Sequence, residues 1–237
     1  MTNYLIETQD LTKQYGSQTS VNRLNLHLKA GRIYGLLGRN GAGKTTTMKM
    51  LLGLTQPTAG AVYLFGMPLR GNEKKILPRI GSLIESPGFY PNLTGTENLK
   101  IFATLRGIPN AHAIQDALEL VGLPYRDKKL FSQYSLGMKQ RLAIALAVMH
   151  DPELLILDEP AAGVAREEAY TLMQLIRDLA HERNMTIIFI EHDMEIVFNY
   201  ADVISVLRDG EMIATGTPDE IKQNTYVQQA YLGGDVS

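Results

Sequence analysis

The stretch Gly38-Arg39-Asn40-Gly41-Ala42-Gly43-Lys44-Thr45 decides the fold class of this 237-residue chain. It fits the pattern G-x-x-x-x-G-K-[ST] at every fixed position. Before it, residues 33–37 are apolar and short enough for a buried strand, and after it residues 46–52 have helical composition and end at Gly53, a predicted helix cap. The sequence therefore predicts a strand, a glycine-rich loop and a helix in succession.

A loop of this kind is typical of phosphate binding. Its glycines let several backbone N–H groups converge at the positive end of a helix. Lys44 would then reach the β and γ phosphates, and the hydroxyl of Thr45 would bind Mg²⁺. The alternative, a glycine-rich turn with an accidental lysine, is disfavoured by the flanking strand and helix. The predicted nucleotide-binding residues of this segment are Gly38, Arg39, Asn40, Gly41, Ala42, Gly43, Lys44, Thr45 and Thr46.

Composition limits the possible classes of protein. With 45% hydrophobic and 20% charged residues, the chain is an ordinary globular protein. A net charge of −2 gives no electrostatic reason to expect nucleic acid as a partner. The absence of cysteine excludes disulfides and thiolate metal sites. Because no signal-peptide pattern and no apolar run long enough to span a bilayer occurs, we expect a cytoplasmic protein whose membrane role depends on a partner.

Three regions of different character are predicted around the phosphate loop. Residues 4–34 and 61–65 alternate short apolar segments with turn-forming residues, which predicts antiparallel strands. Residues 87–150 are predicted to form a helical insertion, with helix starts near Thr94 and after Gly137. Strands at 186–190 and 203–207 then alternate with helices, and Asp209-Gly210 predicts a hairpin turn. We interpret residues 4–234 as one α/β unit with a helical subdomain.

The second chemical landmark is an apolar strand that ends in Asp158 and Glu159. In parallel α/β sheets the carboxyl ends of the strands meet the ligand crevice. Asp158 can hold Mg²⁺ through water, and Glu159 can orient and deprotonate an attacking water. Alone, this pattern fits a simple strand end equally well. Its position downstream of a phosphate loop favours the catalytic interpretation.

Two further residues have ambiguous roles when spacing alone is considered. His192 follows the strand at 186–190 and so lies at the same sheet edge as Glu159. A lone histidine at a strand end is more often structural, unless other residues already locate a catalytic crevice there. Tyr15 stands beside Gly16, and an isolated tyrosine is more often half-buried packing than a ligand contact.

Taken together, these residues resemble the nucleotide-binding subunit of ATP-binding cassette (ABC) transporters over about residues 4 to 234. Residues 134–141 resemble the family's signature loop, usually L-S-G-G-Q. His192 matches the switch histidine, and Tyr15 matches the aromatic residue that stacks on adenine. The resemblance therefore implies an ATPase with a P-loop core, an antiparallel β subdomain and an inserted α-helical subdomain.

The resemblance also implies partners. Two subunits close head to tail on two ATP molecules, with Ser135 and Gly137 of one subunit facing the phosphate loop of the other. The pair is a homodimer or includes a second ABC subunit. It acts on a separate membrane permease, which places the chain at the inner face of the cell membrane. Nucleic acid is not an expected partner.

Three departures from the family pattern bear on these expectations. In the signature loop, Leu136 replaces the first glycine and Met138 replaces the glutamine. Glu85 replaces the usual glutamine of the lid loop, where a carboxylate can also face Mg²⁺, as in subunits that expel bacitracin or lantibiotics. Ala165 replaces the usual aspartate of the loop after Asp158-Glu159, which bears on communication between the two ATP sites rather than on ATP binding.

The resemblance divides along the chain. Residues 1–150 resemble bacitracin and lantibiotic export ATPases, whereas residues 151–237 resemble branched-chain amino-acid importer ATPases, notably at 161–163, 190–194 and 230–234. A recombined chimera and a natural member with a drifted second half both fit this pattern.

We expect export of a peptide antibiotic, because the permease contact is expected at the helical subdomain and the Glu85 loop, which resemble exporters. Three alternatives remain. The first is amino-acid import, and the second is a chimera that binds ATP without coupled transport. The third is an ABC ATPase acting on DNA or the ribosome, which usually carries long coiled coils or a second cassette.

Overall fold

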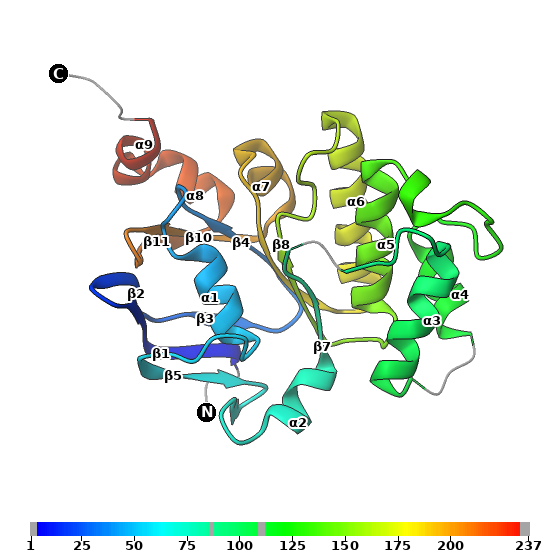
Figure 1. The fold of residues 1–237 in the computed structure, drawn as a ribbon. Coiled ribbons are helices and arrows are strands. Elements are labelled where there is room, and N and C mark those ends of the chain that lie inside the picture. Colours follow the sequence, from blue (N-terminus) through cyan, green and yellow to red (C-terminus); the bar gives the residue numbers. More distant parts are fainter. Residues whose placement is uncertain (1–3, 86–87, 109–111, 233–237) are drawn as a thin grey trace.

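The computed structural model describes residues 4–85, 88–108 and 112–232 and confirms the predicted α/β class. Two sheets pack on either side of the first long helix, and further helices cover the larger sheet (Figure 1). The predicted boundaries at Pro87 and Gly234 lie outside the described residues, as does Ser86 of the lid loop.

The larger sheet has the strand order β11-β10-β4-β9-β8-β7. Its strands pair in parallel except at the β10–β11 edge, which is the predicted hairpin through Asp209-Gly210. Both turn residues have positive φ, as a two-residue hairpin turn requires. The strands are β4 (Ile33–Leu37), β7 (Ile80–Leu83), β8 (Leu154–Asp158), β9 (Thr186–Ile190), β10 (Val203–Arg208) and β11 (Glu211–Gly216).

The central strands of this sheet are buried on both faces. Every residue of β4 and β9 is buried, which explains their continuous apolar sequences. The edge strand β7 was not predicted, because Gly81 and Ser82 interrupt its short apolar run. A side chain at Gly81 would collide with the backbone oxygen of Ala147 on α5, so this glycine permits close packing of helix on strand.

The smaller sheet is antiparallel and confirms the predicted N-terminal strands. It has the order β2-β1-β5-β6, and β3 also pairs with β1. The predicted strand at 61–65 starts earlier and ends at Leu64, because Phe65 adopts a φ of 54° in the turn that follows. The strands are β1 (Tyr4–Tyr15), β2 (Gln18–Leu24), β3 (His27–Lys29), β5 (Ala59–Leu64) and β6 (Met67–Pro68).

Helices surround these sheets and confirm the predicted helical segments. The helical insertion between β7 and β8 contains α3, α4 and α5 (Figure 1). The helices are α1 (Lys44–Leu51), α2 (Glu73–Ile76), α3 (Gly95–Arg106), α4 (Ala113–Leu120), α5 (Leu136–Val148), α6 (Arg166–Glu182), α7 (Met194–Tyr200), α8 (Pro218–Gln223) and α9 (Thr225–Leu232), with 3-10 turns η1 (Leu77–Arg79) and η2 (Phe131–Gln133).

Local sequence fixes where several of these helices begin and end. Thr94 and Glu97 form the predicted capping box at the start of α3. Ser135 caps α5 through its hydroxyl, which accepts a hydrogen bond from the backbone of Met138, so α5 begins one residue before Gly137 rather than after it. Gly53, with a φ of 69°, lies just past the end of α1, as predicted.

Two hydrophobic cores hold the layers together. One joins the helical insertion and α6 to one face of the larger sheet, through residues such as Leu99, Leu142 and Leu157. The other fills the space between the sheets, where Met50 of α1 and Ile6 of β1 are fully buried. The helix that carries Lys44 is therefore packed on both sides, which makes it a rigid support for the loop before it.

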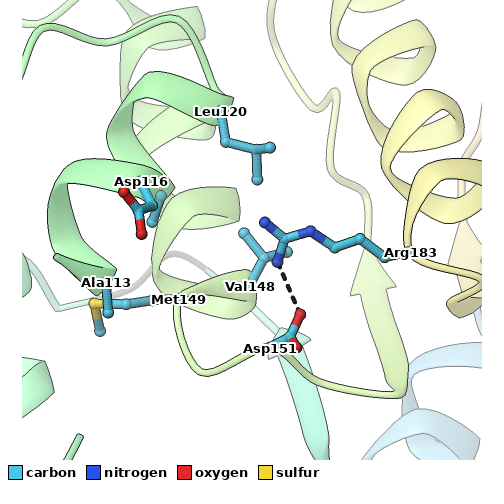
Figure 2. A pocket seen from close by; sticks show the side chains of 8 residues that line it. Ala113, Asp116, Leu120, Val148, Met149, Asp151 and Arg183 are labelled. Atoms are coloured by element: carbon cyan, nitrogen blue, oxygen red, sulfur yellow. Dashed lines mark hydrogen bonds and ion pairs between the residues drawn. The ribbon is translucent and has the colours of Figure 1, made fainter. Parts of the chain in front are cut away.

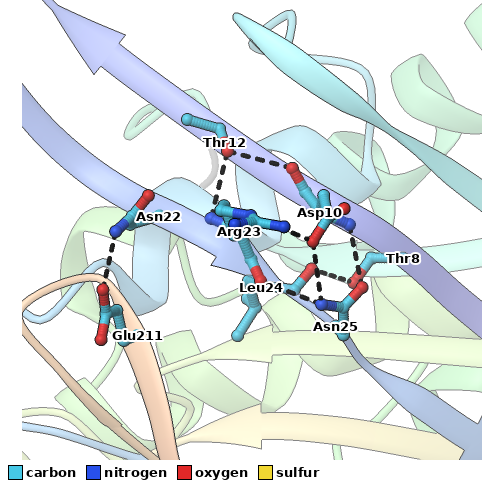
Figure 3. A network of polar contacts seen from close by, with 8 residues as sticks. All are labelled: Thr8, Asp10, Thr12, Asn22, Arg23, Leu24, Asn25 and Glu211. Atoms are coloured by element: carbon cyan, nitrogen blue, oxygen red, sulfur yellow. Dashed lines mark hydrogen bonds and ion pairs between the residues drawn. The ribbon is translucent and has the colours of Figure 1, made fainter.

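A polar network fixes the smaller sheet to the edge of the larger one (Figure 3). The Asn22 amide on β2 donates to the carboxylate of Glu211 on β11 at 2.6 Å. Beside it, Asp10 and Arg23 both have positive φ at an irregularity of the β1–β2 ladder, and Asn25 accepts a hydrogen bond from the Asp10 backbone at 2.8 Å. These contacts brace the β1–β2 hairpin and attach it to β11.

Candidate nucleotide-binding site

The register of the central strands brings the phosphate loop and the carboxylates to one sheet edge. Ile190, the last residue of β9, pairs with Leu36 on one side and with Asp158 on the other. The loop that follows β4 and the acidic end of β8 are thus neighbours across a single strand. This placement agrees with the general rule that ligands bind outside the carboxyl ends of parallel strands.

The glycine loop turns tightly around the Lys44 side chain. Lys44 is only 6% exposed, and its Nζ donates to the backbone oxygens of Gly38 at 2.6 Å and Arg39 at 3.2 Å. Gly41 and Gly43 have φ values of 84° and 96°, which side chains other than glycine rarely adopt. Burial lowers the pKa of Lys44, while the nearby carboxylates of Asp158 and Glu159 raise it. The cation is therefore already positioned at the mouth of the loop.

Asp158 is a half-buried carboxylate, and one of its oxygens is buried without a partner in the described part of the chain. Its side chain forms a hydrogen bond with Thr45, while its Oδ1 is buried without a partner among the described residues. Burial raises the pKa of Asp158, and the hydrogen bond with Thr45 partly opposes that shift. A buried, unpaired carboxylate oxygen beside a hydroxyl is an oxygen pair suited to Mg²⁺, which commonly takes one or two protein ligands together with phosphate oxygens and water.

In the part of the chain that the structure describes, no group of three His, Cys, Asp or Glu side chains could hold a metal on protein ligands alone. A Mg²⁺ that is shared with substrate phosphates does not need such a group.

Glu159 and His192 are in direct contact. The Nε2 of His192 lies 2.6 Å from Oε1 of Glu159, which accepts its hydrogen. Glu159 has a φ of 50°, and its backbone N–H donates to the Ile190 oxygen at 3.0 Å. Spacing alone left the role of His192 open, whereas the family resemblance matched it to the switch histidine, and the structure brings it to the carboxylate that follows Asp158. The pair can orient a water molecule and accept its proton.

A cavity of about 420 Å³ lies between these groups. It contains four of the predicted site residues, together with Gln140, which lies on α5 within the signature stretch 134–141 but was not singled out there as a site residue. The Glu85 carboxylate at its rim pairs with Lys49 at 2.8 Å, and the hydrogen bond from Lys49 lowers the pKa of Glu85. The cavity is lined by Thr45, Leu83, Glu85, Gln140, Asp158, Glu159 and Ala162.

Tyr15 lies at the end of β1, on the hairpin next to the phosphate loop. Its side chain is 51% exposed, and the Lys13 Nζ lies 4.8 Å from the ring centroid. The hairpin contacts α1 through Ser20, whose hydroxyl is 3.0 Å from that of Thr46. Tyr15 therefore offers an accessible aromatic ring on this hairpin.

Ser135 and Gly137 lie at the start of α5 and do not line the cavity of about 420 Å³. Ser135 caps α5, and a side chain added at Gly137 would collide with the carboxylate of Glu168 on α6. Between them, Leu136 is exposed and faces Gly163 in the loop after Glu159.

A second cavity, of about 260 Å³, lies beneath the helical insertion and contains none of the predicted site residues (Figure 2). Asp151 and Arg183 form an ion pair of 3.0 Å at its edge. Its other lining residues come from α4 and the end of α5, so it has no part in the nucleotide site.

Comparison with known protein families decides the classification. The family described as "ABC transporter" matches residues 21–162, which include the phosphate loop, the signature loop and Asp158-Glu159. The chain belongs to the ABC transporter family. It is an ATP-binding subunit of the ABC ATPase type, and this confirms the predicted family and fold.

Among curated relatives, the bacitracin transport ATP-binding protein BcrA of Enterococcus faecalis is 52% identical over 99% of this chain and 75% of its own length. The lantibiotic transport ATP-binding protein SrtF of Streptococcus pyogenes is 39% identical over 88% of this chain and 89% of its own. The comparisons thus place the chain beside ATP-binding proteins of peptide-antibiotic transporters.

Two solved structures extend the comparison. CbiO1 from Clostridium perfringens, part of the ABC transporter complex cbiONQ, superposes with a TM-score of 0.84 at 26% identity, over 98% of this chain and 96% of that one. The cassette MJ0796, a dimer bound to ADP and phosphate in a post-hydrolysis state, has a TM-score of 0.79 at 25% identity, over 90% and 98%.

The branched-chain resemblance is also found, but at the C-terminus. A family described as "Branched-chain amino acid ATP-binding cassette transporter" matches residues 211–237. The comparisons do not support a chimeric origin, because the alignment with BcrA covers 99% of the chain and so includes both halves. Among the described residues, no helix is long and apolar enough to cross a membrane.

Proposed function

We propose that this chain hydrolyses ATP to drive the export of a peptide antibiotic through a separate membrane permease at the inner face of the cell membrane. The observation that carries this proposal is the 52% identity with BcrA over nearly the whole chain. We further infer that residues 4–234 form a single ATP-binding domain, whose subdomain of helices α3 to α5 falls within residues 87–150.

The site residues divide into binding and reacting groups in this proposal. Backbone N–H groups of residues 38–46 and the Lys44 ammonium hold the phosphates, and the ring of Tyr15 stacks on adenine. Glu159 accepts the proton of the attacking water, and His192 holds the Glu159 carboxylate at the distance seen here. Lys44 also stabilises the charge that develops on the transferred phosphoryl group.

Thr45 and Asp158 would hold Mg²⁺, with Glu85 as a third group able to face it from the cavity rim. When bound, the metal neutralises charge on the β and γ phosphate oxygens. Support comes from the unpaired buried Oδ1 of Asp158 and its hydrogen-bonded neighbour Thr45.

Substituting Asp158→Asn separates stability from function. Because burial raises the pKa of Asp158, the folded chain binds the carboxyl proton more tightly than the unfolded chain does, so stability is lost as the pH rises and this carboxyl ionises. We therefore expect Asp158→Asn to match or exceed the parent in thermal midpoint without ligand, yet to need more Mg²⁺ for half-maximal ATPase activity. Calorimetry at pH 7 and a Mg²⁺ titration measure both. A lower midpoint with an unchanged Mg²⁺ requirement would contradict this role.

The two remaining site residues support a dimer. Ser135 and Gly137 lie outside the cavity of their own chain, so in the proposed dimer they bind the ATP held by the phosphate loop of the other subunit. The related cassette MJ0796 was solved as a dimer with ADP and phosphate. We propose that two copies of this chain close in the same way when ATP binds.

A second candidate function is uptake of branched-chain amino acids, and the match at residues 211–237 favours it. Antibiotic export and amino-acid uptake would change different properties of a cell that expresses the chain. Expressed with a candidate permease in a sensitive host, the chain is expected to raise the inhibitory concentration of bacitracin or a lantibiotic. The Glu159→Gln variant should not do so. Unchanged antibiotic sensitivity together with ATP-dependent leucine uptake would replace the first proposal with the second.

A further inference from the structure

The segment that carries Glu159 is held by residues 190–192, which are the last residue of β9 and the two that follow it. The backbone oxygen of Ile190 accepts from the Glu159 N–H at 3.0 Å. The side chain of Glu191 accepts from the Ala161 N–H at 2.7 Å. His192 Nε2 contacts Glu159 Oε1 at 2.6 Å. The backbone on both sides of Pro160 and the reacting side chain are therefore fixed from one short segment.

Glu191 is an unusual residue to find in this position. It is only 6% exposed, and a buried carboxylate is costly unless hydrogen bonds satisfy it. Burial raises the pKa of Glu191, while hydrogen bonds from the backbone N–H groups of Ala161 and His192 oppose the shift. The side chain thus connects the backbone of the histidine segment to the backbone of the loop after Glu159.

The conformation of Glu159 needs such support. Its φ of 50° lies in the left-handed region, which a glutamate adopts only when its surroundings impose it. The Ala162 N–H donates to the Glu159 backbone oxygen at 3.0 Å, so the chain turns sharply just after the carboxylate. A bond to Ala161, in the middle of this turn, fixes the direction in which the Glu159 side chain leaves the backbone.

The far end of the same loop is held by the same region. Arg166, the first residue of α6, pairs with Glu195 at the start of α7. The Tyr170 hydroxyl donates to Glu195 Oε2 at 2.8 Å. Residues 159–166 are thus attached to residues 190–195 at both ends, although Ala165 occupies the place of the usual aspartate in between.

We propose that Glu191 is a positioning residue for hydrolysis, which holds the turn at Ala161 so that the Glu159 carboxylate meets His192 and the attacking water. This inference rests on the proposed role of Glu159. It adds a residue that touches neither nucleotide nor water, and that acts through the backbone of a loop thirty residues away.

Two variants of Glu191 test the proposal. Glu191→Leu removes both acceptors, and we expect kcat of the full chain to fall by about 10- to 100-fold while KM for ATP stays within about twofold, because catalysis is more sensitive to misplacement than binding. Glu191→Gln keeps one acceptor oxygen, so it should give an intermediate kcat with no loss of thermal stability. Hydrogen exchange of the 159–165 segment should be faster in Glu191→Leu than in the parent.

Two controls distinguish the role of Glu191 from the proposed role of Glu159. Glu153→Gln, at an exposed residue just before β8, should leave kcat unchanged. If Glu159→Gln loses turnover but both Glu191 variants keep it, Glu191 does not position the loop, and the role of Glu159 stands. If Glu159→Gln itself keeps full turnover, the proposed role of Glu159 fails instead. If Glu191→Gln loses both kcat and thermal stability, Glu191 has a structural role and the inference is overturned. If Glu191→Leu does not fold, the result for Glu191→Gln decides alone.

Discussion

The Glu159→Gln variant is expected to bind Mg·ATP normally but to hydrolyse it about 10² to 10⁴ times more slowly, the usual loss when a general base is removed. The amide keeps the length of the side chain and can still accept a hydrogen bond from His192, which contacts Oε1 at 2.6 Å. It cannot accept a proton from water. Steady-state ATPase assays and calorimetric titration with ATP measure the two quantities separately.

Glu153→Gln is the matched control, because it alters a glutamate at the other end of the same strand region. Glu153 pairs with Arg79 on the surface, so the control should keep full turnover. If dimer opening depends on hydrolysis, Mg·ATP should also accumulate a closed dimer of Glu159→Gln in size-exclusion chromatography. Full ATPase activity in Glu159→Gln would instead assign the water to another group, with Glu85 and His192 the first to test.

Much of the site could be predicted because its chemistry is local in sequence. The pattern of the phosphate loop lies within the consecutive residues 38–45, so spacing alone identifies it. Asp158 and Glu159 stand together at the end of one buried strand, and hydrophobicity identifies that strand. The structure adds that β9 lies between this strand and β4, and this register turns two separate motifs into one site.

Other features depend on contacts that no local pattern reveals. In the sequence, Glu191 is an ordinary polar residue after a strand. Only the fold shows that it is buried and accepts a hydrogen bond from the backbone of Ala161. Gln140 lines the cavity from α5, whose first turn was recognised for its resemblance to the signature loop. The proposed contribution of Ser135 and Gly137 involves a second subunit, so the structure of one chain does not test it.

The Lys44→Ala variant is expected to bind ATP about 10- to 100-fold more weakly. Lys44 is held at the mouth of the loop by the Gly38 and Arg39 oxygens, so its ammonium needs little rearrangement to reach a phosphate. A hydrogen bond to a charged group contributes about 1.5 to 3 kcal/mol. Each 1.4 kcal/mol changes the dissociation constant about tenfold, which gives the expected range. The backbone N–H groups remain, so binding should weaken rather than vanish.

Lys49→Ala provides a matched control on the same helix. Lys49 pairs with the exposed Glu85, and an exposed ion pair contributes little, about 0 to 1 kcal/mol. Titration calorimetry of both variants, with circular dichroism to verify folding, should therefore show a large increase in the ATP dissociation constant for Lys44→Ala and a small one for Lys49→Ala. Equal losses in the two variants would point to a general effect of positive charge on α1. An unchanged ATP dissociation constant in folded Lys44→Ala would refute the assignment of residues 38–45 as the phosphate loop. The ammonium that this loop encloses would then contribute nothing to ATP affinity.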